Sequence, residues 1–343
     1  EVIPGAGWKL ERNPNYFKPG QPYLDAVAIT LIVDTTTQVA SFVSGRDDIW
    51  QGPSSPPEQY MPLFYKIRDE GKVNWLDFLG GTSLDGTLMY QGKPPFNNLK
   101  LRQALNLAID REKMGLATWG DSLKHPQLMV YSQEAYWSTR KDSEIWNAVP
   151  GWGTGAKKQQ EIEQAKQLVK DAGYPNGIDI EHMLSSGGGP SAGESAGEYL
   201  QQTLAQIGIR TTMFQTTAAQ RTQRLESGTF TIFHYLLRQT TKDPDEIVGS
   251  NFVTGAPRNY HDYSNPAVDK LYIQMSSELD LVKRRQILGQ IVDIVIIQDV
   301  AFAPDQGIDS IDVWWKRLHG VQIGQTNHSP PGLMRADRLW KSE

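Results

Sequence analysis

Hydrophobic residues follow two spacings along the chain, the helical period of about 3.6 residues and the short apolar runs typical of strands. The clearest change comes at Lys93-Pro94-Pro95, after which Leu101 and Ile109 share the apolar face of a helix expected over 98–118. Two successive prolines fix φ and remove two backbone donors, so no regular element continues through them. Residues 82–91 before them have strand-like composition. The pattern therefore predicts a strand, a rigid break and a long amphipathic helix.

The first part of the chain has the pattern of a small α/β segment. Asp34 stands before a helix expected over 35–44, and Gly45 is placed to end it. Aspartate is a favourable N-cap and glycine a common C-terminal stop, so both ends of this helix are marked. A second helix near 58–70 and a strand over 73–79 complete the segment.

Strands and helices alternate over the middle of the chain. The expected strands are 178–184, 209–215 and 230–236, and the expected helices are 157–172, 195–206 and 218–227. This alternation predicts an α/β layer with crossover connections. Further helices are expected after Asp243, over 265–278 and 281–299, followed by extended segments at 300–304 and 308–315 that return to the first domain.

Length and composition limit the classes of protein that fit. A chain of 343 residues predicts about two domains. The formal net charge of −5 is spread over mixed charges without a basic block, which argues against nucleic acid as a partner. The chain has no cysteine, so disulfides, thiolate metal sites and thiol nucleophiles are excluded. No run of about 18 apolar residues predicts a membrane span.

One motif offers a catalytic alternative. Gly193-Glu194-Ser195-Ala196-Gly197 matches the G-x-S-x-G nucleophile elbow of serine hydrolases, with His319 and His328 downstream. An elbow requires a strand that runs straight into the turn, whereas a Gly/Ser/Pro loop separates 178–184 from this serine. The favoured interpretation is a loop that leads into a helix, and Ser195 stays the alternative. No two histidines stand three or four residues apart, so neither a metal site nor a cofactor is predicted.

A polar loop after the strand 230–236 is the main candidate for ligand contact. Arg238 to Asp243 follow a buried-strand pattern, and open α/β sheets bind ligands outside the carboxyl ends of their strands. The alternative is an ordinary solvated loop. The long irregular stretch 120–156 is rich in tryptophan, and loops of this length in compact domains are usually functional.

Several motifs together resemble family 5 extracellular solute-binding proteins, the dipeptide-, oligopeptide- and nickel-type receptors of ATP-binding cassette importers. The most specific is Pro94 to Asn98 followed by Leu101-Arg102-Gln103-Ala104-Leu105 and Ala108-Ile109-Asp110-Arg111. Others, in the family's order, are Ala172 to Gly177, Ile207-Gly208-Ile209, Asp243-Pro244-Asp245 and Tyr263 to Asp269. Singly each motif is weak, but the series covers nearly the whole chain.

The resemblance implies an α/β fold of the two-lobed periplasmic-binding-protein type (type II, Venus-flytrap). Residues 1–92 and 301–343 would belong to lobe I, which is expected to be incomplete here because family members are longer and begin with an export signal or lipoprotein anchor. Residues 93–300 would form lobe II. Hinge closure is expected at two crossover stretches, Tyr90 to Lys93 and Val300 to Pro304.

The resemblance also implies a function. The chain is expected to be no enzyme but a monomeric receptor, periplasmic or extracellular and lipid-anchored if the preceding segment carries an anchor. It would capture a peptide or other oligomeric solute between the lobes and deliver it to the membrane permease of the importer. The expected ligand-binding residues are Tyr90, Trp119, Trp137, Trp152, Leu237, Arg238, Gln239, Thr240 and Thr241.

One position departs from the peptide-binding members of the family. Where they carry an aspartate for the α-ammonium group of a peptide, this chain has Thr240, and Leu237 replaces a nearby tryptophan. A neutral hydroxyl cannot pair with a buried ammonium as a carboxylate can. The ligand class therefore stays open between peptide, sugar and metal complex, and Arg238 would suit a carboxylate or a sugar.

Overall fold

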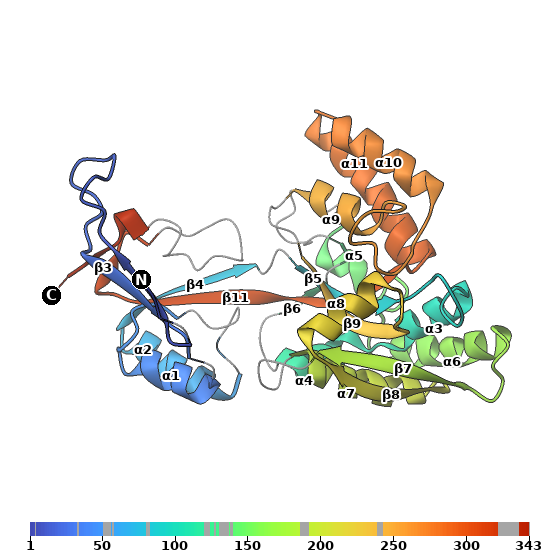
Figure 1. Ribbon diagram of the computed structural model, residues 1–343. Helices are drawn as coiled ribbons and strands as arrows, with labels where there is room; N and C mark the ends of the chain where they lie inside the picture. The colour runs from blue at the N-terminus through green and yellow to red at the C-terminus, as the bar shows by residue number, and fades with distance from the viewer. Residues whose placement is uncertain are drawn as a thin grey trace. The chain divides into compact units, whose positions relative to one another are not determined.

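The computed structural model describes the chain except residues 4, 33, 51–55, 57, 80–82, 120–123, 127, 130–136, 138–139, 186–191, 239–242, 322–335 and 343. The chain divides into two compact units (Figure 1). Unit 1 comprises Glu1–Gly81 and Asp309–Glu343, and unit 2 comprises Thr82–Ile308. The boundaries expected at 92/93 and 300/301 thus fall inside unit 2, because the strands beside them pair with each other in its sheet.

The described part of unit 1 consists of strands, the α-helices α1 and α2, and the 3-10 helices η1 and η3. Its elements are β1 (Val2–Ile3), β2 (Gly7–Glu11), β3 (Ala26–Thr30), α1 (Thr35–Val43), η1 (Glu58–Tyr60), α2 (Met61–Asp69), β4 (Val73–Leu79), β12 (Leu318–His319), η3 (Ala336–Arg338) and β13 (Trp340–Lys341). β11 (Gln306–Trp315) begins in unit 2 and pairs antiparallel with β4 from Asp309 onward. Asp34 caps α1 as predicted, since its carboxylate accepts the Thr37 amide at 2.8 Å. Phe42, Phe64 and Trp50 pack together as the aromatic core of the unit.

Unit 2 is an α/β layer, as the alternating pattern predicted. Its five-stranded sheet has the order β10-β5-β9-β7-β8. The strands are β5 (Ser83–Met89), β7 (Ile178–Ser185), β8 (Ile209–Thr216), β9 (Ile232–Arg238) and β10 (Phe302–Pro304). β7 runs parallel to β8 and β9, whereas β5 lies antiparallel between β9 and β10. A short strand, β6 (Lys124–Pro126), pairs with the start of β11.

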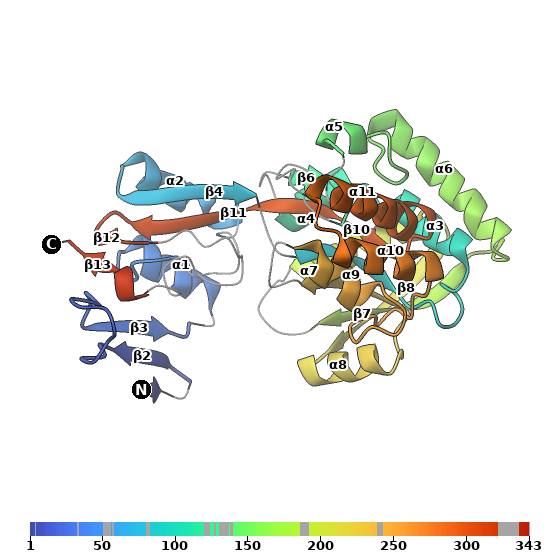
Figure 2. The ribbon, with the colours of Figure 1, turned by 90° about the horizontal axis from the view of Figure 1, so that it is seen from above.

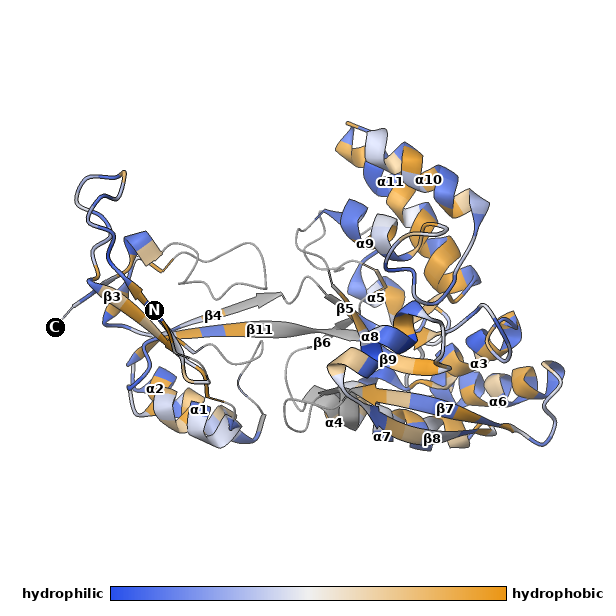
Figure 3. Cartoon of the chain, in the orientation of Figure 1, coloured by the Kyte–Doolittle hydropathy of each residue, from blue (hydrophilic) through white to orange (hydrophobic). Residues whose placement is uncertain are grey.

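Helices cover both faces of this sheet (Figure 2). They are α3 (Leu99–Ala108), α4 (Arg111–Trp119), α5 (Asp142–Ile145), α6 (Gly155–Asp171), α7 (Ala192–Ala205), α8 (Ala218–Glu226), α9 (Pro244–Asn251), α10 (Pro266–Ser277) and α11 (Leu281–Val292), which continues as a π-helical segment, η2 (Asp293–Gln298). Figure 3 shows hydrophobic and hydrophilic residues interspersed along α6, α10 and α11, the pattern of helices with one buried and one solvated face.

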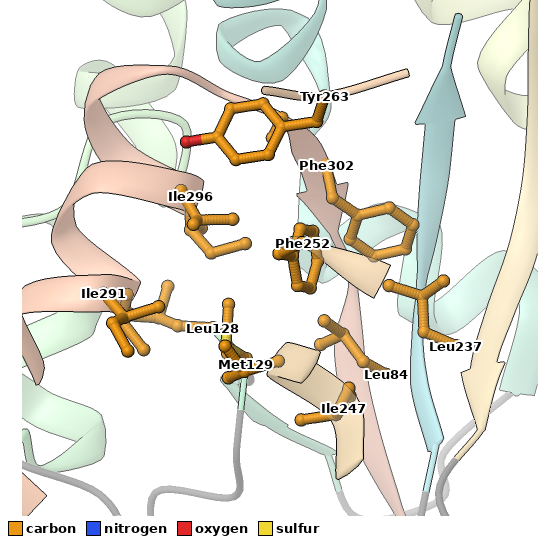
Figure 4. Packing of buried hydrophobic residues seen from close by; sticks show 14 of the residues in the cluster. Leu84, Leu128, Met129, Leu237, Ile247, Phe252, Tyr263, Ile291, Ile296 and Phe302 are labelled. Atoms are coloured by element: carbon orange, nitrogen blue, oxygen red, sulfur yellow. The ribbon is translucent and has the colours of Figure 1, made fainter. Parts of the chain in front are cut away.

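Two hydrophobic clusters lie on the two faces of the sheet. The cluster with α9 to α11 contains Leu237, Leu84 and Phe302, whose side chains gather beside the strands in Figure 4. The cluster with α3, α6 and α7 contains Ile232 and Met89. Residues of β9 alternate between the two clusters, as the two-residue period of a strand requires.

The long helix expected over 98–118 is two helices in the structure. α3 ends at Ala108, Ile109 is extended at φ −65° and ψ 113°, and α4 begins at Arg111. The break leaves backbone carbonyls without helical hydrogen bonds, and a side chain from α6 satisfies two of them. Lys158 Nζ donates to the carbonyl of Leu107 at 3.0 Å and to that of Ile109 at 2.8 Å. A tertiary interaction therefore interrupts a pattern that is continuous in the sequence.

Candidate functional site

The carboxyl ends of the parallel strands of unit 2 meet at one edge of the sheet. β7, β8 and β9 end at Ser185, Thr216 and Arg238, and Ser83 at the start of β5 pairs with Arg238. Parallel strands of open α/β sheets present their ligand sites at this edge. The polar loop predicted to contact ligand continues directly from β9, and Gln239, Thr240 and Thr241 lie outside the described residues.

Trp137 and the far end of this loop are connected through one arginine. The guanidinium of Arg284, on α11, lies over the Trp137 ring at 4.8 Å from its centroid. Arg284 also donates two hydrogen bonds, of 2.9 and 2.7 Å, to the carboxylate of Asp243, which caps α9. Asp243 lies immediately after the undescribed loop, so Arg284 fixes the tryptophan and the loop end to one point.

Trp152 lies in the core of unit 2. Its ring is 1% exposed, contacts Trp146 edge-on at 5.3 Å and carries the guanidinium of Arg111 at 4.5 Å from its centroid. Leu237 is also 1% exposed and belongs to the cluster shown in Figure 4. The structure gives both residues packing contacts, because their side chains point into the unit rather than to its surface. Their predicted ligand role stays a prediction.

A buried ion pair holds the segment that carries Trp152. Lys158 and Glu161 on α6 lie 2.6 Å apart, with side chains 1% and 4% exposed. Glu161 accepts the backbone amides of Gly151 at 2.9 Å and Gly153 at 3.2 Å. Burial, and then the charge of Arg111, lowers the pKa of Lys158 to about 8. The pair thus joins α6 to the turn before it, and nothing in the local sequence pattern indicated it.

A second buried ion pair lies on the face of the sheet that α7 covers. His234 Nε2, on β9, is 2.7 Å from Asp305 Oδ2, which follows β10. Burial lowers the pKa of His234, but the hydrogen bond and charge of Asp305, with the charge of Asp85, outweigh it, so the pKa is raised above its ordinary value. His182, on β7, stays neutral because burial, with the charge of His234, lowers its pKa to about 3. Sequence spacing could not have found this group, because its members lie on four different segments.

Tyr90 lies at the opposite edge of the sheet. It follows β5, which runs from Ser83, paired with Arg238, to Met89, paired with Ile232. Its amide donates to Thr231 at 3.0 Å. Six residue steps along a strand span about 20 Å, so Tyr90 cannot share a small ligand with the loop after Arg238. The structure therefore separates Tyr90 from the end of β9 at Arg238, although Tyr90 packs against the same hydrophobic cluster as Trp152 and Leu237.

For Trp119 and Arg238 the structure describes the backbone but not the side chain. Trp119 is the last residue of α4, and Arg238 is the last residue of β9. Their backbones fix where they stand in unit 2, and their contact with a ligand stays a prediction.

The nucleophile-elbow alternative does not fit the described backbone. Ser195 is the fourth residue of α7, whereas an elbow needs a sharp strand-to-helix turn with the serine at its tip. β7 ends at Ser185, so nine residues separate this strand from Ser195. Of the two downstream histidines, His319 lies in unit 1 beside Ser342, and His328 lies outside the described residues.

Within the described residues, no group of three histidine, aspartate or glutamate side chains has the arrangement of a metal site. The helices described there also include none with the length and hydropathy of a membrane span. The strand ends and the contacts of Arg284 make the carboxyl edge of the unit 2 sheet, with Trp137 and Asp243, the candidate site.

A family model decides where the chain belongs. The model of bacterial extracellular solute-binding proteins, family 5 (middle region), matches residues 1–259. The chain belongs to this family. The resemblance carried by the proline break and the motifs after it is thereby confirmed.

Relatives within family 5 are distant and longer than this chain. Heme-binding protein A of Haemophilus influenzae is 26% identical over 308 residues, which are 84% of this chain and 51% of that protein. The glutathione-binding protein GsiB of Escherichia coli K12 is 26% identical over 220 residues, 64% of this chain and 38% of that protein. The chain thus spans about half or less of the length of the relatives it matches.

Solved structures of periplasmic binding proteins share the fold. DppA of Helicobacter pylori, in complex with the peptide STSA, has a TM-score of 0.76 at 19% identity, over 98% of this chain and 60% of that chain. The periplasmic EDTA-binding protein EppA has a TM-score of 0.79 at 16% identity, over 100% and 63%. These scores confirm the predicted α/β periplasmic-binding-protein fold, of which this chain spans about three fifths.

Proposed function

We propose that this chain is part of an extracytoplasmic receptor that captures a small solute and delivers it to the permease of an ATP-binding cassette importer. The observation that carries the proposal is the family 5 match over residues 1–259, on a fold shared with periplasmic binding proteins. Such a receptor performs no chemistry on its cargo, and the helical position of Ser195 removes the support for the hydrolase alternative.

The solute would bind at the carboxyl edge of the unit 2 sheet. Trp137 offers a ring that Arg284 orients from one side, and the polar loop after Arg238 offers backbone and side-chain hydrogen bonds. Binding sites of this kind combine apolar and aromatic walls with a few fixed polar groups. Trp119 and the loop residues Gln239, Thr240 and Thr241 belong to the same proposed site.

The names of the similar proteins suggest the chemistry of the solute. They mention the peptide STSA, glutathione, heme and EDTA, all of which carry carboxylates. Thr240 supplies no carboxylate for a peptide ammonium group, whereas the Arg238 guanidinium can bind a carboxylate through two hydrogen bonds. We therefore favour an oligomeric solute recognised through its carboxylate.

The whole receptor would act by closing two lobes, for which units 1 and 2 are the candidates. A solute shifts a receptor toward its closed form only through contacts that the open form lacks. The receptor would work as a monomer in the periplasm or at the cell surface, with a lipid anchor on a preceding segment as one arrangement.

Native mass spectrometry of the full-length protein from its own cells tests the proposal. We expect one trapped solute per chain, and a higher melting temperature when the solute is added back, because binding to the folded state alone stabilises it by about 2.7 kcal/mol at a hundredfold excess over Kd. Peptide Ser-Thr-Ser-Ala, glutathione, heme and EDTA form the first panel of solutes. No trapped mass and no shift with any of them would contradict the proposal, as would stoichiometric fluorophosphonate labelling of Ser195.

A further inference from the structure

Asp305 stands where the chain leaves unit 2. It follows β10, and β11 begins with the next residue and leads to the unit boundary after Ile308. The Asp305 amide donates to the carbonyl of Asp85, near the start of β5, at 2.8 Å. Arg111 Nε donates to the carbonyl of Pro304 at 2.7 Å. The stretches by which the chain enters and leaves unit 2 are thus joined at this residue.

The side chain of Asp305 adds a third connection, to His234 in the middle of the sheet. The pair is 2.7 Å apart, with side chains 6% and 10% exposed. Thr87, on β5, pairs with His234 across the strands and is fully buried beside it. Because water is largely excluded here, the attraction between imidazolium and carboxylate is stronger than it would be at the surface.

We propose that His234 and Asp305 form a pH-dependent clamp on the stretch by which the chain leaves unit 2. The clamp is charged and tight at acidic pH and weakens as the pH rises and His234 loses its proton. This goes beyond solute capture, since it concerns the rigidity of the connecting strand and not the binding site.

The surrounding charges set the direction of the effect. Asp305 and Asp85 face His234 from β10 and β5, and they raise its pKa against the opposing effect of burial. His182 faces it from β7 and is neutral, while Arg111, on α4 beside Asp305, keeps its charge because burial lowers its pKa only to about 10. His234 is therefore the histidine of this network whose pKa lies above the ordinary value.

The direction in which pH changes the stability of the clamp follows from the linkage between proton binding and clamp closure. A histidine whose pKa is raised in the closed clamp contributes its full stabilisation below the pKa of the open state, about 6.5, and loses it as the pH rises through the higher value. The open population should increase about tenfold for every unit by which the closed-state pKa exceeds the open-state value.

Hydrogen exchange of the whole chain, followed by mass spectrometry between pH 5.5 and 9, tests the clamp. After correction for the intrinsic exchange rate, peptides covering 301–308 should lose protection as the pH rises. His234→Gln retains an amide donor but cannot titrate, so its protection should be independent of pH. His319→Gln, in unit 1, is the matched control and should keep the dependence of the unchanged protein.

Asp305→Asn gives a second, independent reading. Without the Asp305 carboxylate, only the charge of Asp85 opposes the effect of burial, so the titration of His234 followed by NMR should move to lower pH. Asp305→Asn also tests the His234–Asp305 clamp if His234→Gln fails to fold. Protection of 301–308 that is independent of pH in the unchanged protein, or that keeps its pH dependence in His234→Gln, would overturn the proposal, as would an unmoved His234 titration in Asp305→Asn.

Discussion

Arg284 lies over the ring of Trp137, with its guanidinium carbon 4.8 Å from the ring centroid. The same guanidinium is 14% exposed and forms paired hydrogen bonds to Asp243. A planar cation that stacks on an aromatic ring and binds a carboxylate through two donors cannot be replaced by a lysine without loss. This one side chain therefore holds both Trp137 and Asp243, the N-cap of α9.

Substitution of Arg284 should weaken both contacts. We expect Arg284→Lys to cost about 1–2 kcal/mol in the free energy of unfolding and Arg284→Ala about 2–3 kcal/mol, since charge-assisted hydrogen bonds contribute about 1.5–3 kcal/mol. Urea denaturation measures this. Lys283→Ala, at an exposed position of the same helix, is the control and should change stability by less than about 0.5 kcal/mol. Equal stabilities of Arg284→Lys and the unchanged protein would show that stacking and bidentate geometry contribute nothing.

Solute affinity should separate Trp137 from Tyr90. Trp137→Ala should weaken binding of the natively trapped solute about tenfold, because it removes an aromatic contact worth about 1–2 kcal/mol. Tyr90→Ala should change affinity less than about twofold, because Tyr90 lies beyond Met89, at the other edge of the sheet. Isothermal titration calorimetry gives both values. A larger loss from Tyr90→Ala than from Trp137→Ala would move the site away from the edge where β9 ends.

The Lys158–Glu161 pair should be strongly sensitive to removal of one partner. Glu161→Gln leaves an uncompensated charge on a side chain that is 1% exposed, so we expect a loss of about 3–5 kcal/mol in the free energy of unfolding. Lys158→Met combined with Glu161→Leu should cost much less than the single change, because neither partner then leaves an unpaired buried charge. Glu163→Gln on the same helix removes the exposed ion pair with Lys166, and as the control it should cost less than about 1 kcal/mol. Similar losses from Glu161→Gln and Glu163→Gln would refute this account.

Asp312 should make its contribution to the stability of unit 1 larger at acidic pH than at neutral pH, the reverse of the usual behaviour of an aspartate. Burial raises the pKa of this carboxyl group, on β11, to about 6, whereas an unfolded aspartate titrates near 3.9. Between these values the folded state binds more protons than the unfolded state, so the contribution of Asp312 to stability falls as the pH rises from about 4 to 6.

Replacement by asparagine should remove this effect. Asp312→Asn should leave stability unchanged near pH 4 and raise it at pH 7 by about 1 kcal/mol, allowing for solvent screening of a partly exposed group. Chemical denaturation at the two pH values measures the difference, with exposed Asp69→Asn on α2 as the control. A gain that is the same at pH 4 and pH 7 would rule out titration of Asp312 as its cause.

The sequence by itself determined most local structure and the family. Asp34 and Asp243 cap helices where their positions predicted them, and the alternating pattern gave the strands and helices of the α/β layer. These features depend on neighbours within a few residues, which is the range over which capping and hydrophobic periodicity act. The proline break also falls where predicted, although it lies between β5 and α3 inside unit 2 and not at its boundary.

Only the tertiary structure decided how distant segments meet. It divided the expected helix over 98–118, because Lys158, about fifty residues later, takes the carbonyls of Leu107 and Ile109. It placed Tyr90 and Arg238 at opposite sheet edges, because β5 runs antiparallel to β9. It also joined His234 to Asp305 across 71 positions. Strand direction and buried charge pairing depend on contacts between segments far apart in the chain, and no local pattern of residues encodes them.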